Sequence, residues 1–368
     1  MFNKDRLRIA KDLRGYSNTD FAEKLGCSPS KVKQLLDIDK AISENDQIHV
    51  AQVLNLPMSF FAQNDLTPQE TEQIFYRSVA RIKAQHRKTN EAYTLLAKNI
   101  NKYLMTKIKM PEFNKPDFGI TETRDQYNYV ENLAVNLRAM WGLGIQPINN
   151  MISLCELKGI RVFRLPLEVK EIDALSFFEE DSGSPFIFLN DFKSAERVRF
   201  DCAHELGHTV MHTHNRNVRS ESDNRILETE ADKFASEFLM PTEGFLSTAP
   251  RYLSLENMLA YKKVWRTSLK AINYKSHKLN LISDWVYRSN SIKISSLGYH
   301  LEEPQETYRD ESVMLPKIIS VLASDPKFNK NKMLDEIGIS EDDFNQLTFD
   351  SLIKIKSSKP ERKLYLVE

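Results

Sequence analysis

Hydrophobic residues recur at helical spacing through the first third of the chain. In residues 1–65 the pattern has the texture of five short helices joined by tight turns. Residues 66–118 continue at the same spacing after a helix-start signal, in which Thr67 is followed by Pro68 and by acids in the first turn. We therefore expect a five-helix domain followed by a helical connector.

From residue 121 the pattern changes to a mixture of helices and short β-like runs. The stretch NYVENLAVNLRAMWGLG predicts a helix that stops at Gly142 and Gly144, and a second helix is expected over roughly residues 148–158. Runs rich in Ile, Val and Phe then predict three strands, at residues 160–165, 175–179 and 186–190. Helical spacing returns after residue 245. The fold expected from this order is mainly α, with a small α+β domain around the three strands.

Changes of pattern, rather than linkers, divide the chain, because glycine is scarce (11 residues) and no Gly/Ser-rich linker is present. We expect the five-helix domain at residues 1–65, the connector at 66–118, the mixed domain at 119–300 and a small helical module at 301–368. The module contains KMLDEIGISEDDFNQLTF, which looks like a helix-turn-helix around Gly338. Its second helix begins with three acids that would repel phosphate, so we expect it to pack against the chain or a partner.

Charge and cysteine usage indicate which partners and which cellular compartment to expect for the protein. The formal net charge is zero, so any contact with nucleic acid must come from a local patch. Cys27, Cys155 and Cys202 are an odd number spread far apart, which indicates a reducing compartment rather than a disulfide framework. The first residues lack the apolar core of a signal peptide, and no run approaches 18 apolar residues. We expect a cytoplasmic protein that is not attached to a membrane.

One short helical stretch, RFDCAHELGHTVMH at residues 199–212, carries the clearest chemistry. His204 and His208 are four residues apart, so a helix places both imidazoles on one face, where they can bind a single ion. Glu205 is angled toward a water on that ion rather than the ion itself. This is the H-E-x-x-H arrangement of zinc peptidases, in which Zn²⁺ lowers the pKa of its water and the carboxylate takes the proton.

Histidines that follow this motif are poor candidates for the third ligand. His214 has the spacing of a longer zinc signature, but that signature needs glycine at the sharp turn, where this chain has Met211. His212 continues the four-residue series, yet a ligand one further turn away would string the imidazoles along the helix axis. We expect His212 to pack or hydrogen-bond beside the site.

Carboxylates in the downstream stretch ETEADKFASEFLMP, residues 228–241, are better candidates for the third ligand. Glu228 shares a helix face with two alanines, which would allow a close helix-to-helix approach around a metal. Asp232 is one turn further on the same side, where it can accept the free ring N–H of a liganding histidine. Glu230 would reach the same side if the helix were rotated, so both Glu228 and Glu230 remain open.

The first sixty residues have the spacing of a helix-turn-helix. A compact helix from Thr19 to Leu25 is followed by a tight turn at Gly26 and Cys27, and Ser28 with Pro29 caps and starts the next helix. Residues free to face a DNA major groove are Asn18, Thr19, Ser28, Ser30, Lys31, Lys33 and Gln34.

Two family resemblances rest on these stretches. RVRFDCAHELGHTVMH and ETEADKFASEFLMP, with FIFLN and WGLGIQPINNMISLCELKGIRVFRLPL before them, resemble the ImmA/IrrE family of zinc metallopeptidases over roughly residues 121–300. The resemblance implies a gluzincin-like, zincin-type fold, zinc at His204 and His208, Glu205 as general base and Glu228 as acidic ligand, with Glu230 as its alternative. The family acts on a partner repressor to relieve transcriptional repression in phage, mobile-element or stress-response circuits.

Residues 3 to 62 resemble the Xre family of repressor-like DNA-binding domains, with some departures. Asn18 stands where the family usually has glutamine, and Asp37 and Asp39 stand where glycine, glutamate or basic residues are more common. Through residue 60 there are nine Lys or Arg against eight Asp or Glu, a weak electrostatic footprint for a duplex. We expect DNA binding, with protein contact or dimerisation as the alternative use of this domain.

Two functions follow as expectations. The first is a transcription regulator whose zinc-dependent endopeptidase, gluzincin-like, cleaves a regulatory protein or its own chain to switch transcription. The second is a repressor or antitoxin-like protein that uses its zinc domain as a sensor or scaffold. The partners expected are Zn²⁺, a double-stranded DNA operator, a protein substrate that is a partner repressor or toxin, and a second copy of the chain in a homodimer.

Overall fold

The computed structural model describes residues 2–37, 39–63, 84–116, 128–165, 172–212, 221–299 and 302–353. In the N-terminal half, the helices are α1 (Lys4–Leu13), α2 (Asn18–Lys24), α3 (Pro29–Leu36), α4 (Glu44–Val53), α5 (Met58–Ala62), α6 (Ala84–Lys107), α7 (Tyr129–Met140) and α8 (Met151–Leu157). The strands are β1 (Arg161–Arg164), β2 (Ala174–Glu179) and β3 (Ser184–Leu189). The later helices are α9 (Ala195–Met211), α10 (Glu221–Leu239), α11 (Thr242–Thr248), α12 (Leu255–Trp265), α13 (Leu269–Lys278), α14 (Asp284–Ser296), α15 (Met314–Ala323), α16 (Lys330–Ile337) and α17 (Glu341–Leu347).

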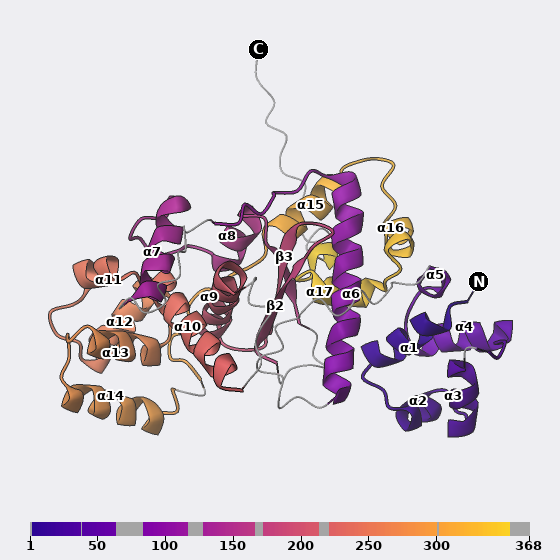
Figure 1. The fold of residues 1–368 in the computed structure, drawn as a ribbon, viewed down its shortest axis with the longest axis horizontal. Helices are drawn as coiled ribbons and strands as arrows, with labels where there is room; N and C mark the ends of the chain where they lie inside the picture. Colours follow the sequence, from indigo (N-terminus) through magenta and orange to yellow (C-terminus); the bar gives the residue numbers. More distant parts are fainter. Residues whose placement is uncertain are drawn as a thin grey trace, which may run out of the picture.

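Helices predominate in the described residues and accompany one small sheet, as the hydrophobic pattern predicts. Figure 1 shows α1–α5 grouped at one end of the molecule and α11–α14 at the other, with the sheet between α6 and the pair α9 and α10. Within the described residues, none of the helices combines the length and the apolarity needed to cross a membrane.

The first four N-terminal helices, α1 to α4, each begin at a polar side chain that caps them. Ser17 caps α2 in a reciprocal arrangement with Asp20, and Ser28 accepts the backbone N–H of Lys31 at the start of α3. The apolar side chains of this group converge on a common core, in which Phe21, Val32 and Phe61 are fully buried. Helix α2 lies within one residue of the helix expected from Thr19 to Leu25, and α3 begins at Pro29 as expected. An Xre-like domain with DNA-binding activity stays a prediction.

Most side chains predicted to face a DNA groove are exposed. Asn18 and Thr19 at the start of α2, and Ser28, Ser30, Lys33 and Gln34 around α3, all lie on the surface. Lys31 departs from the expectation that it is free, because its ammonium group lies 2.8 Å from a carboxylate oxygen of Asp46. The reason is tertiary, because Asp46 is in the first turn of α4, fifteen residues further along the chain.

A three-stranded sheet occupies the centre of the chain, in the order β1-β3-β2. β3 pairs in parallel with β1 and antiparallel with β2, so the middle strand is the last of the three in sequence. All three predicted runs form strands, each shifted by no more than two residues at either end. The six residues of β3 are buried, because both faces of the sheet are covered.

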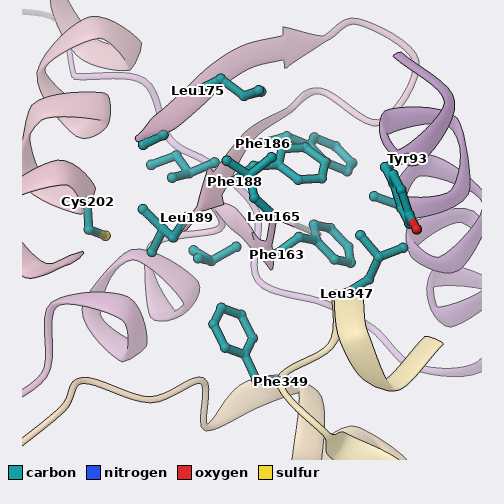
Figure 2. Packing of buried hydrophobic residues seen from close by; sticks show 14 of the residues in the cluster. Tyr93, Phe163, Leu165, Leu175, Phe186, Phe188, Leu189, Cys202, Leu347 and Phe349 are labelled. Carbon is teal, nitrogen blue, oxygen red and sulfur yellow. The ribbon is translucent and has the colours of Figure 1, made fainter. Parts of the chain in front are cut away.

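The two faces of the sheet have different partners. Phe163, Phe177, Phe186 and Phe188 stack across the strands on the face toward α6, with ring centroids 5.1 to 6.1 Å apart. Figure 2 shows this aromatic group with Tyr93 of α6 on one side and with Leu347 and Phe349 at and just beyond the end of α17 below it. The opposite face, which includes Leu189, packs on α9 near Cys202.

Helix α9 lies against that second face, and among the described helices α10 packs most extensively on α9. Gly207 allows the approach, because a Cβ added there would meet the ring of Phe234 at 3.0 Å. Ala231 and Ala235 of α10 are fully buried at the same contact. The close packing of small residues holds the side chains of α9 and α10 within reach of one another.

A buried ion cluster ties α9 to the segments around it. The Arg199 guanidinium donates to Asp310 Oδ2 at 2.6 Å, and both side chains are at most 2% exposed. The same carboxylate accepts the backbone N–H of Met151 at the start of α8 and lies 2.9 Å from Arg266. Asp310 therefore joins three separate parts of the fold through one pair of oxygens.

The C-terminal helices pack between the N-terminal helices and the sheet. Arg14 at the end of α1 makes a two-point ion pair with Asp343 in the acidic first turn of α17, at 2.6 and 2.7 Å. Asn55 donates to Asp342 at 3.1 Å, and Arg164 of β1 pairs with Asp350 at 3.0 Å. Two of the three acids expected to repel phosphate, Asp342 and Asp343, thus bind the N-terminal helices, while Glu341 pairs with Lys330 of α16.

Candidate metal centre

Three histidines follow one another at four-residue steps along α9 and face α10. His204, His208 and His212 have ring centroids 4.7 and 5.0 Å apart in successive pairs. His208 and His212 are almost fully buried, and His204 is partly accessible at its surface. The helical repeat alone accounts for this row, because residues four apart lie one turn above each other.

Ring nitrogens of the first two histidines converge with one carboxylate of α10. His204 Nε2 lies 3.1 Å from His208 Nε2 and 3.2 Å from Glu228 Oε2, and His208 Nε2 lies 3.5 Å from Glu228 Oε1. Ligand atoms about 2.0–2.1 Å from a tetrahedral Zn²⁺ are about 3.3 Å apart. The three donors therefore have the chemistry and the spacing of a three-ligand zinc site, and they form a candidate metal-binding group in the described residues.

The two alternatives for the acidic ligand lie in different places. Glu228 contacts both histidines of the motif, whereas a Glu230 oxygen lies 2.9 Å from His212 Nε2. Asp232 lies 2.9 Å from His204 Nδ1, on the side of that ring away from the cluster. The geometry favours Glu228 over Glu230 as ligand and Asp232 as the group behind His204, and these roles stay predictions until a metal is bound.

Glu205 points from α9 toward the sheet and is held by a residue that the sequence reasoning missed. Ser176 of β2 donates its hydroxyl to Glu205 Oε2 at 2.5 Å, and both side chains are buried. The only sequence signal is a lone serine inside the apolar run ALSFFE. Because that run reads as a strand buried on both faces, a polar residue within it needs a partner.

Burial and neighbouring groups shift the pKa values of the site residues, upward for Glu205 and His204 and downward for His208. Burial raises the pKa of Glu205 to about 7, against the lowering effects of His204 and of the Ser176 hydrogen bond. Burial lowers the pKa of His208 to about 4. Burial also acts to lower the pKa of His204, but hydrogen bonds to Asp232 and Glu228 outweigh it and raise that pKa to about 10.

Glu228 stays ionised beside these rings. Burial acts to raise its pKa, yet the hydrogen bonds and charges of His204 and His208 hold it well below its usual range. An ionised carboxylate next to two imidazoles is a donor set that attracts a divalent cation. The perturbed values gathered at one place are typical of a functional site.

Other predicted residues lie away from the cluster or outside the described residues. Cys202 is fully buried, with its sulfur 3.8 Å from that of Cys155, which agrees with a packing role. His214 falls in residues 213–220, which lie outside the described residues.

Comparison with known proteins supports a peptidase-type domain at this centre. Among curated proteins the chain has no match. The predicted Xre-like domain lies outside residues 155–277, the segment that matches a family model, and so stays a prediction. Residues 155–277, which contain the sheet, α9 and α10, match the model of the metallopeptidase family Peptidase_M78, described as the IrrE N-terminal-like domain.

Proposed function

We propose that this protein is a transcription regulator whose zinc-dependent endopeptidase domain cleaves a regulatory protein, a partner repressor or its own chain. The observation that carries the proposal is the convergence of His204, His208 and Glu228, with Glu205 buried beside them. The match of the surrounding residues to a metallopeptidase family supports the same chemistry.

Different residues of the chain would bind the metal and transfer the proton during hydrolysis. His204, His208 and Glu228 would hold Zn²⁺, which supplies a Lewis acid that polarises a peptide carbonyl and acidifies a water. Glu205 would accept the proton of the attacking water and deliver it to the departing amine. Ser176 occupies one oxygen of that carboxylate, which leaves Oε1 for the proton transfer.

Zinc content tests the metal part of the proposal. We expect the purified protein to contain about one zinc per chain, because three donors at these distances complete an open site. Glu228→Ala should lose the metal, whereas Glu243→Ala, an exposed carboxylate on α11, should keep it. Elemental analysis after gel filtration measures both. Equal zinc in the two variants would contradict the assignment of Glu228.

The proposal includes DNA binding, which we assign to helices α2 and α3. The exposed side chains of Lys33 and Gln34 on the second helix of the pair support it, as does the capped turn that ends at Ser28. A peptidase fused to such a domain would convert cleavage into a change of promoter occupancy. The occupant expected is a double-stranded operator read by a homodimer.

Lys33→Ala should weaken DNA binding and flatten its dependence on salt. Loss of one phosphate contact lowers the slope of log affinity against log salt by about one. The measurement is fluorescence anisotropy at several salt concentrations with duplexes selected from random sequence. Lys317→Ala, an exposed lysine on α15, is the matched control. If the wild-type protein selects no duplex, or if both variants behave alike, α3 does not read DNA.

A further inference from the structure

The two histidines of the motif are supported in different ways on the side away from the cluster. His204 Nδ1 faces Asp232 directly, and that carboxylate is largely exposed. His208 Nδ1 instead faces another ring nitrogen, Nδ1 of His212, at 2.9 Å. His212 Nε2 in turn faces Glu230 Oε2 at 2.9 Å, so a buried imidazole stands between His208 and its carboxylate.

Hydrogen-bond rules assign a direction to this chain of groups. Two neutral ring nitrogens 2.9 Å apart can share only one proton, so one donates and the other accepts. The Glu230 carboxylate can only accept, which requires the proton of His212 to be on Nε2 and leaves its Nδ1 as an acceptor. His208 must then carry its proton on Nδ1, and its Nε2 has a bare lone pair toward His204 and Glu228.

We propose that His212 and Glu230 are positioning residues, which select through two hydrogen bonds the tautomer of His208 that can bind a metal. The proposal rests on the zinc site proposed above and deepens it. His212 is itself fixed at the end of α9, where it is the C-cap residue and its backbone N–H donates to the His208 carbonyl at 2.9 Å. Groups that orient a liganding histidine typically contribute 10–100-fold to metal affinity.

Zinc affinity of two variants separates this role from simple packing. His212→Leu keeps an apolar side chain of similar size in the buried space but removes the acceptor. His212→Asn keeps an acceptor oxygen close to the position of Nδ1. We expect His212→Leu to bind Zn²⁺ about 10–100-fold more weakly than the wild type, and His212→Asn to recover most of the loss. His277→Leu, a partly exposed histidine on α13, is the matched control and should bind as the wild type does.

The measurement is competition for Zn²⁺ against a chelator of known affinity, with thermal unfolding of the metal-free proteins to show that each is folded. Ring ¹⁵N chemical shifts provide a second readout in metal-free and zinc-loaded protein, where we expect the proton of His212 on Nε2 in both. Equal zinc affinity of wild type and His212→Leu, or a proton on Nδ1 of His212, would overturn the proposal. A wild-type protein that binds no zinc would instead contradict the proposed function, while the ring shifts would still decide the tautomers.

Discussion

Glu205→Gln should retain zinc and lose about 10²–10⁴-fold of the cleavage rate, the range that a positioned acid–base group contributes. The amide is nearly isosteric with the carboxylate and still offers an oxygen to the Ser176 hydroxyl, so the site should keep its shape. What disappears is the ability to accept a proton. The substrate can be found by comparing new peptide amino termini in cells that express the wild type or the variant, and the rate can then be measured with purified proteins.

Glu243→Gln is the matched control for this variant, because Glu243 is an exposed carboxylate on α11 away from the histidines. It should cleave at the wild-type rate. If Glu205→Gln contains full zinc and also cleaves or regulates as the wild type does, the peptidase reading is wrong. The domain would then act as a sensor or scaffold, the other function expected from the sequence.

Asp310→Asn should lower the free energy of unfolding by about 3–5 kcal/mol, the usual cost of removing one partner from a buried ion pair. The variant keeps the shape of the side chain but leaves the Arg199 guanidinium charged and buried without its counter-ion. Because Asp310 also accepts the first backbone N–H of α8 and pairs with Arg266, the loss should spread beyond α9. Urea denaturation followed by circular dichroism measures the difference.

Two further variants serve as controls for the loss of stability expected in Asp310→Asn. Asp39→Asn changes an exposed aspartate and should leave stability within about 0.5 kcal/mol of the wild type. Arg199→Met combined with Asp310→Leu removes the fully buried guanidinium together with its partner. It should be less destabilised than Asp310→Asn alone, because Arg266, the one charge that still loses Asp310, is partly exposed to water. A stable single variant would show that this cluster does not tie the fold together.

Local signals in the sequence predicted much of the architecture. The cap expected at Ser28, the apolar periodicity and the three Ile-, Val- and Phe-rich runs indicate helices and strands close to those in the structure. These signals work because capping and amphipathic burial act over a few neighbouring residues. The pairing of β3 with both β1 and β2 was not predictable in this way, since strand order depends on contacts between distant segments.

The site residues that could be predicted from the sequence are likewise those related by local contacts, and the others depend on contacts between distant segments. His204, Glu205 and His208 could be recognised from the sequence because one helical turn relates them, and the helical repeat is a local property. The choice between Glu228 and Glu230 depends on how α10 is rotated against α9, and Ser176 reaches Glu205 from a strand 29 residues earlier. The sequence by itself determined the chemical groups and their helical spacing, whereas only the packing of α10 and β2 against α9 decided which carboxylate joins the histidines and which hydroxyl holds Glu205.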